Sequence, residues 1–283
     1  MSSVFIAGPA SWNSLVVLDR LPEPVPHMQF AEDSWETVGG TSAGKALSMT
    51  ALGRPVLLYA ISGTDEPGAR VRAAVADAGV PALWADGVTE RHLNLMTRAG
   101  ERVSLYLASP EATDGAGDVV LTAAMADADV LVLDLAAEPL RLLPLAQRSG
   151  RPIWVDVHDY DGEAEFHRPF LAAADVVFCN ADRLNDPIAF LRATVAAGAR
   201  FAVCTLGAEG AVAVDAAGEV HRVPAVPVEV LDTNGAGDAF LAGVLHAHLE
   251  GAALQEALTA GARSASSVLR TRHLHPLLDD VLG

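Results

Sequence analysis

The sequence predicts a three-layer, Rossmann-like α/β domain with a central, mostly parallel sheet and a small β-sheet lid. Short apolar runs alternate with helix-like segments along most of the chain, as in the unit Val56 to Ile61, Ala69 to Ala78 and Val80 to Trp84. Strands joined through a helix in this way are parallel, with right-handed crossovers. Two segments of alternating polarity, about residues 13–38 and 87–107, interrupt this rhythm and predict a small, partly exposed sheet.

The remaining elements follow from the same periodicities. Further strands are expected at Val4 to Ala7, Val130 to Leu135, Ile153 to Val157, Val176 to Cys179, Phe201 to Thr205, Ala211 to Val214, Val220 to Val223 and Val226 to Leu231. Further helices are expected at Leu47 to Leu52, Val119 to Ala126, Leu140 to Gln147, Ala239 to Leu249 and Ala253 to Leu269. In the second lid segment, Thr89 to Leu107 predicts a hairpin that turns at Ala99-Gly100.

Composition limits the class of protein. A chain of 283 residues can bury a sizeable core, and we expect a single domain over residues 1–283. The net charge is -17, which argues against nucleic acid or an anionic membrane as a partner. Cys179 and Cys204 are isolated in apolar runs, as buried thiols in a reducing cytoplasm would be. We expect no signal peptide and no membrane-spanning segment.

The run Gly235-Ala236-Gly237-Asp238 lies between an expected strand and an expected helix. Free N–H groups and the positive end of the helix dipole make such a helix start an anion site. Glycine lets the backbone approach a ligand closely, because no Cβ intervenes. Asp238 adds a carboxylate beside this site. The combination suits phosphoryl transfer to a hydroxyl, since amides can hold phosphate oxygens while the carboxylate takes the proton.

A second copy of the tetrapeptide, Gly115-Ala116-Gly117-Asp118, predicts only an ordinary helix start. No apolar strand precedes it, and Val119-Val120-Leu121 follows in place of small residues. The tetrapeptide alone is therefore a weak indicator of function.

The longer run from Asp232 to Phe240, with Gly243 downstream, resembles the second signature of the ribokinase-like (PfkB-type) carbohydrate kinases. The resemblance implies that Asp238 is the catalytic base and that the amides of Gly235, Ala236 and Gly237 form the anion hole. It also implies ATP as the donor, Mg²⁺ as a cofactor, and a hydroxymethyl group of a small sugar or sugar derivative as the acceptor. The same resemblance implies that the small, partly exposed sheet is the lid. A nucleoside kinase of the same fold is the alternative, and a homodimer through the lid is consistent with either.

Other positions match the family pattern one by one. The resemblance implies nucleotide contacts at Asn180, Thr205, Gly207 and Gly210. It implies acceptor contacts at Asn13, Gly39, Gly40, Gly44 and Asp232, and metal contacts at Asp156 and Asn180.

Four departures from that pattern are visible, and the first is Asn13, which stands where the family commonly has an Asp that binds sugar hydroxyls. Gly44 or Lys45 stands where the family has an Asn that contacts the sugar, and Arg183 stands where it has the Glu of a metal-related motif. No Gly-rich loop follows the last long helix, so activation by a monovalent cation stays open. These departures keep a non-catalytic relative that binds a sugar or a nucleotide as an alternative.

A different class of enzyme is also conceivable from the sequence. Gly39 to Lys45 satisfies the GxxxxGK pattern of a phosphate-binding loop. The next residue is Ala46, however, where Ser or Thr would hold Mg²⁺. A P-loop NTPase acting through Lys45 is therefore disfavoured.

Overall fold

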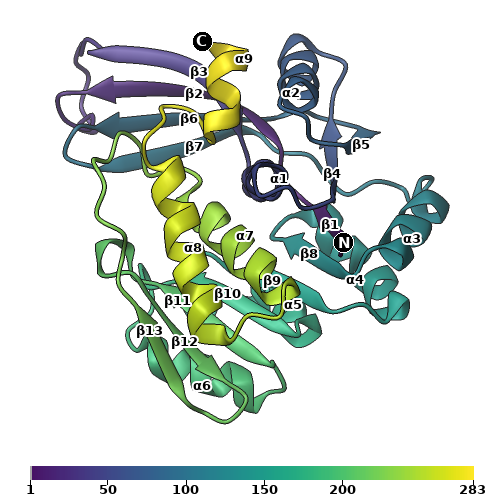
Figure 1. Cartoon of the computed structure of the whole chain (residues 1–283). Helices are drawn as coiled ribbons and strands as arrows, with labels where there is room; N and C mark the ends of the chain where they lie inside the picture. Colours follow the sequence, from purple (N-terminus) through teal and green to yellow (C-terminus); the bar gives the residue numbers. More distant parts are fainter. Residues whose placement is uncertain (1) are drawn as a thin grey trace.

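The central sheet of the computed structural model contains nine strands within residues 2–283, the part of the chain that the structure describes (Figure 1). These strands are β1 (Val4–Ala7), β4 (Val56–Ser62), β5 (Ala82–Asp86), β8 (Val130–Asp134), β9 (Ile153–Asp156), β10 (Val176–Asn180), β11 (Phe201–Thr205), β12 (Ala211–Asp215) and β13 (Val220–Val223). Their order is β13-β12-β11-β10-β9-β8-β1-β4-β5. Strands β12 and β13 are antiparallel to their neighbours and the others are parallel. The prediction of a mostly parallel sheet is confirmed.

Helices cover both faces of this sheet, which gives the three layers expected from the sequence (Figure 1). One face packs against α1 (Thr41–Ala51), α2 (Glu66–Asp77), α7 (Ala236–Leu249) and α8 (Leu254–Val268). The other packs against α3 (Asp118–Asp127), α4 (Ala137–Ser149), α5 (Arg168–Ala173) and α6 (Pro187–Ala196). The alternation in β1 shows the principle, because Val4 and Ile6 enter one core and Phe5 and Ala7 the other. None of the helices in the described chain is both long and apolar enough to cross a membrane.

A second sheet forms the lid, at the end of the molecule where the chain terminates in α9 (Asp279–Leu282) (Figure 1). It consists of β2 (Ser11–Leu18), β3 (Asp33–Gly39), β6 (Glu90–Thr97) and β7 (Arg102–Ala108), in the order β3-β2-β6-β7. The predicted hairpin is confirmed as β6 and β7. Asn13 lies inside β2, opposite Thr37 and His92.

One predicted strand is absent from the described residues. Residues 226–231 form a loop, in which Val230 and Leu231 are 51% and 65% exposed. Pro227 has no N–H to contribute to a ladder, and this segment pairs with no neighbouring strand. Conversely, the sequence analysis did not anticipate α5 and α6, although Asp186 caps α6 by accepting a hydrogen bond from the Ala189 N–H.

Candidate active site

Two aspartates lie side by side at the carboxyl edge of the central sheet. Asp134 ends β8 and Asp156 ends β9, and the two residues are register partners in the β8–β9 ladder. Both are buried. Ligands of open α/β sheets bind at this edge.

The start of α7 has the properties expected of an anion site. Gly235 has φ 78°, and a Cβ at this position would lie 2.6 Å from the Leu274 carbonyl oxygen. Within the described chain no side chain caps the first turn, so the N–H groups of Gly237 and Asp238 stay free of helical acceptors. A Cβ added to Gly237 would meet no atom within 4 Å. Free amides therefore adjoin open space here.

Lys45, on α1, connects this helix start with the two strand ends. Its Nζ lies 2.7 Å from Asp238 Oδ1, 2.9 Å from Asp134 Oδ1 and 3.5 Å from Asp156 Oδ2. The lysine side chain is fully buried. Burial opposes the charge, but the three carboxylates outweigh burial and raise the pKa of Lys45. The ammonium group is therefore charged at neutral pH. We call Lys45, Asp134, Asp156 and Asp238 the acid cluster.

The pKa values of Asp238 and Asp156 are shifted in opposite directions. Burial raises the pKa of Asp238 to about 6, with Lys45 opposing and Asp134 adding to the rise. Burial also acts to raise the pKa of Asp156, but His158 and Lys45 outweigh it and the net shift is downward. His158, the strand-end neighbour, has φ 49° and donates its backbone N–H to Asp156 Oδ1 at 2.9 Å. Such strained backbone is common at functional sites.

On the side of the site where the acceptor is expected, the backbone at two glycines lies close to polar side chains. A Cβ on Gly44 would lie 2.7 Å from Asp238 Oδ2, and one on Gly39 would lie 2.0 Å from Asn13 Nδ2. Gly40 precedes α1 with φ 93°. The Oδ1 of Asn13 accepts a hydrogen bond from the Ser11 hydroxyl at 2.8 Å. The structure thus places Gly44 at Asp238 and Asn13 at Gly39, as neighbours on the two sides of the β3–α1 junction.

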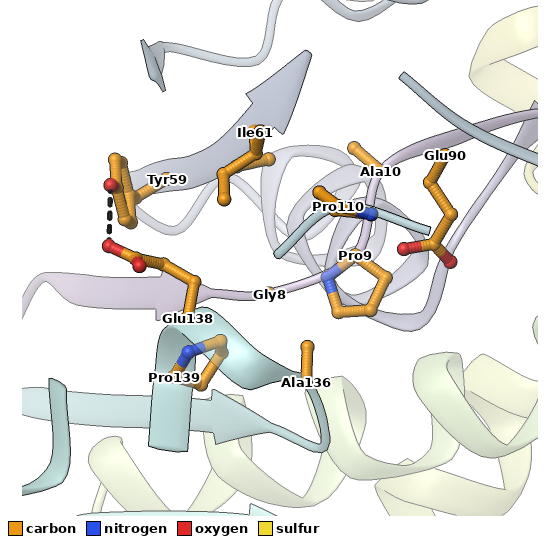
Figure 2. Close-up of a pocket in the computed structure, with 11 residues that line it drawn as sticks. Gly8, Pro9, Ala10, Tyr59, Ile61, Glu90, Pro110, Ala136, Glu138 and Pro139 are labelled. Carbon is orange, nitrogen blue, oxygen red and sulfur yellow. Dashed lines mark hydrogen bonds between the residues drawn. The ribbon is translucent and has the colours of Figure 1, made fainter. Parts of the chain in front are cut away.

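A small hollow of about 20 Å³, enough for about one water molecule, lies next to this region, and Figure 2 shows residues that line it. Its lining includes Gly8, Pro9, Ala10, Tyr59, Ile61, Glu90, Pro110, Ala136, Glu138 and Pro139. The Glu138 carboxylate is occupied, since it accepts hydrogen bonds from the Tyr59 hydroxyl and from Arg141. The hollow adjoins the acid cluster, because a Cβ on Gly8 would lie 3.0 Å from Asp134 Cβ.

The residues expected on the nucleotide side lie further along the sheet. Asn180 and Thr205 are register partners at the ends of β10 and β11. Gly207 opens a short 3₁₀ helix, Gly207–Glu209, and Gly210 follows it with φ 94°. Arg183 lies 3.9 Å from Asp159 and 3.8 Å from Asp161, so it pairs with an acidic loop and is largely exposed.

Asp232 organises the turn before α7. Its carboxylate accepts hydrogen bonds from the backbone N–H of Asn234 at 2.9 Å and from the Asn234 side-chain amide at 2.8 Å. The Asn234 Oδ1 in turn accepts a hydrogen bond from Arg102 of β7 at 2.6 Å. On the other side of the same turn, His273 Nδ1 lies 3.0 Å from the Thr37 hydroxyl of β3. The lid is therefore linked to the turn before α7 through β7, and to the segment that contains His273 through β3.

Within residues 2–283 no three His, Cys, Asp or Glu side chains form a group that could hold a metal ion. Of the two predicted metal contacts, Asp156 pairs with Lys45 and His158, and Asn180 Oδ1 accepts the Asp182 N–H at 3.0 Å. Mg²⁺ commonly needs only one or two protein carboxylates when phosphates and water complete its shell. Asp156 and Asn180 offer oxygen ligands of the kind Mg²⁺ prefers, and metal binding at these two residues stays a prediction.

The phosphate-binding-loop interpretation does not hold. Residues 41–45 belong to helix α1, and the Lys45 ammonium is enclosed by the acid cluster. A phosphate-binding loop needs these residues as a turn that wraps around a phosphate.

Sequence reasoning missed part of the cluster. Asp134 was treated as an ordinary strand residue, and Ser42, which donates a hydrogen bond to Asp134 Oδ2 at 2.6 Å, was not noticed. The available signal was the pair of apolar strands that both end in Asp, together with a single lysine among apolar and small residues. Aspartate and lysine side chains are both unusual in a buried segment.

Known proteins match this chain along nearly its whole length. The family model described as "pfkB family carbohydrate kinase" matches residues 17–278. Acarbose 7(IV)-phosphotransferase of Actinoplanes sp. is 33% identical over 269 residues, which cover 92% of this chain and 90% of that protein.

Solved structures agree with this match. A microbiome-derived acarbose kinase, Mak1, superposes with a TM-score of 0.84 and 28% identity, covering 99% of this chain and 98% of the other. Arabidopsis thaliana ribokinase, complexed with ribose and ATP, has a TM-score of 0.78 at 20% identity and 99% coverage of both chains, which shows the shared fold. The match of the family model and the similarity to the phosphotransferase lead to one conclusion: the chain belongs to the pfkB family of carbohydrate kinases.

Proposed function

We propose that this protein transfers the terminal phosphoryl group of ATP to a hydroxymethyl group of a sugar or sugar derivative. The observation that carries the proposal is the start of α7, where free amides adjoin open space and the Asp238 carboxylate belongs to the same turn. The alternative of a P-loop NTPase requires a phosphate at Lys45, whose three carboxylate partners would repel it.

The proposed chemistry needs three actions from these residues. Asp238 accepts the proton as the acceptor O–H bond breaks and the new O–P bond forms. The amides of Gly235, Ala236 and Gly237 stabilise the charge on the transferring phosphoryl oxygens. The bond between that phosphorus and the bridging oxygen breaks, and its electron pair leaves with ADP. Mg²⁺, when bound with ATP, would neutralise part of the phosphate charge.

Two influences on Asp238 oppose each other, and their balance supports the role of base. Burial, the larger influence, favours the neutral form of the carboxyl, whereas the Lys45 ammonium favours the ionised form. The net result is a pKa of about 6. At neutral pH the carboxylate is ionised and yet close enough to titration to accept a proton.

For the substrates, we assign roles by position. Asn180, Thr205, Gly207 and Gly210, at the ends of β10 and β11 and after them, would contact the nucleotide. Asn13, Gly39, Gly40, Gly44 and Asp232 would surround the acceptor. The two similar proteins named for acarbose support a sugar derivative, and they make acarbose the first acceptor to test.

The cellular setting is also proposed. Cys179 and Cys204 are neighbours across the β10–β11 ladder and both are free thiols, which supports a reducing cytoplasm. The net charge of -17 supports small-molecule rather than nucleic-acid partners. A homodimer through the lid is proposed as well, and its test is given below.

The experiment is a coupled assay of ADP release with Mg-ATP and a panel of monosaccharides, acarbose and nucleosides. We expect ADP release with at least one sugar derivative. Asp238→Asn should lower kcat by about 10²- to 10⁴-fold, because the general base is lost.

The chain offers a matched control for this variant. Asp118 occupies the same place in the second Gly-Ala-Gly-Asp run and starts α3, but it pairs with Arg141 at 2.9 Å, away from the acid cluster. Asp118→Asn should leave kcat unchanged. ADP release with nucleosides alone would favour the nucleoside kinase, and calorimetric binding of sugars with no ADP from any acceptor would favour a binding protein.

A further inference from the structure

Lys45 is the only lysine in the sequence, and it is fully buried beside three carboxylates. A buried lysine needs one good partner to offset its desolvation, and additional carboxylates add their own desolvation cost. The three partners come from β8, β9 and α7, so the ammonium group joins both strand ends to the proposed base. The shortest of the three distances, 2.7 Å, is the one to Asp238.

Two consecutive residues of α1, Gly44 and Lys45, lie against different carboxylate oxygens of Asp238. Lys45 Nζ donates a hydrogen bond to Oδ1. Gly44 lies beside Oδ2, where even one added carbon would be at 2.7 Å. One oxygen is thus held by a charge-assisted hydrogen bond, and the absence of a side chain at position 44 leaves room beside the other.

We infer that Lys45 is a positioning residue, which fixes Asp238 so that Oδ2 receives the proton of the acceptor hydroxyl. This inference rests on the proposed function. The O–H bond of the acceptor breaks and its proton moves to Oδ2, while Lys45 keeps its own proton throughout. Gly44 provides the space through which the hydroxyl reaches Oδ2. Without Lys45, the carboxylate would be free to rotate away from Asp134, and the base would lose its orientation.

The test compares Lys45→Met, which keeps the length of the side chain without its charge, with wild-type protein in the ADP assay. We expect kcat to fall by about 10²-fold or more, as misplacement of a reacting group by about 1 Å does. We expect KM for ATP and for the acceptor to change by less than about threefold, since neither binding surface is altered. Gly44→Ala, which keeps the lysine, should also lower kcat because its methyl group would displace Oδ2.

Arg54→Met is the control for loss of a buried cation. Arg54 is 3% exposed and pairs with Glu250, outside the acid cluster. It should lose stability but keep its kcat per folded molecule. If folded Lys45→Met keeps kcat within about threefold of wild type, the inference is overturned.

Lys45→Met can also fail to fold, because three carboxylates would remain buried without the ammonium group that neutralises them. Lys45→Met combined with Asp134→Asn removes one of these charges and keeps the question open to measurement. A folded double variant with kcat reduced by about 10²-fold supports the inference, and one with wild-type kcat overturns it. If wild-type protein releases ADP and Asp238→Asn does not, an active Lys45→Met disproves only the role of Lys45. If wild-type protein releases no ADP with any acceptor, the proposed function itself fails.

Discussion

The ionisation of Asp238 governs the expected pH dependence of the reaction. The groups that face it are the Lys45 ammonium of α1 and the Asp134 carboxylate of β8, with His158 acting from the end of β9. Burial is the largest influence, and the pKa of Asp238 is raised to about 6. A base works only when it is deprotonated, so activity should be full above this pKa and fall below it.

We therefore predict an acid limb in the pH profile of kcat/KM for the acceptor. The value should be level near neutral pH and should fall by about tenfold per pH unit below roughly pH 6. The measurement is initial-rate ADP release at saturating ATP, with the coupling enzymes checked at each pH. A profile that stays level down to pH 4.5 would contradict the raised pKa of Asp238, because the base would then need an ordinary or lowered pKa.

At this scale the sequence indicated the base but not its surroundings. Asp238 could be singled out as the predicted base because its local pattern, glycines before a helix, is contiguous in the chain. The contacts that α1 makes with the cluster join distant parts of the chain: the hydrogen bond from Ser42 to Asp134 spans 92 positions, and that from Lys45 to Asp238 spans 193. Such a cluster depends on how strands are ordered in the sheet, and a single sequence does not specify that order.

At the scale of the element, the first turn of α7 combines two glycines with different requirements. Gly235 needs its positive φ of 78° and its approach to Leu274. Gly237 has no positive φ, and a Cβ there would meet only open space. Replacement by alanine should therefore separate folding from function.

We predict that Gly237→Ala keeps or slightly raises the melting temperature but lowers kcat/KM for ATP. Alanine in a helix is favoured over glycine by roughly 0.5–1 kcal/mol, whereas the new methyl group would occupy the space proposed for the phosphoryl group. Thermal unfolding and steady-state kinetics of the same preparation provide both readings. Unchanged kinetics would mean that the phosphate lies elsewhere.

Gly235→Ala, in contrast to Gly237→Ala, should lower the stability of the protein. A non-glycine residue in the left-handed region costs roughly 1–2 kcal/mol, and the contact with the Leu274 carbonyl adds to it. We expect a lower melting temperature together with reduced activity. A variant as stable as wild type would contradict the strained geometry of this turn.

The elements themselves were predictable where a periodic pattern was long and uninterrupted. The hairpin of β6 and β7 and the strands of the parallel sheet follow directly from alternation and from apolar runs. The prediction of a strand at residues 226–231 was wrong. The valines and the leucine of this segment suggested a strand, but Pro227 has no N–H to donate and no neighbouring strand is available for pairing. Composition alone does not show whether a partner strand is available.

For the whole molecule, the alternation of strands and helices was sufficient to predict the layers, and the interruptions were sufficient to predict the lid. The strands of the lid extend slightly beyond the predicted segments, since β2 begins at Ser11 and β7 ends at Ala108. That residues 1–283 behave as one domain remains a prediction. The hydrogen bond between Arg102 of the lid and Asn234 joins the lid sheet to the turn before α7 and favours a single domain.

The lid also determines the last prediction, which concerns assembly. β7 is an edge strand of the lid sheet, and Val103, Leu105 and Leu107 are 40%, 44% and 54% exposed. An exposed apolar edge strand readily pairs with another chain. A second copy of this protein offers the same strand and would cover it, so we predict a homodimer formed through β7.

Analytical ultracentrifugation over a range of protein concentrations tests this prediction. Wild-type protein should sediment as a dimer, and Leu105→Lys with Leu107→Lys should shift it to monomer, because two desolvated ammonium groups would face their copies. Val119→Lys is the control, since Val119 is 83% exposed on α3, away from the lid. A wild-type monomer at all concentrations, or a dimer that survives the double substitution, would show that this edge is left to solvent. In that case the charged ends of β7, at Arg102, would be what keeps the strand from pairing.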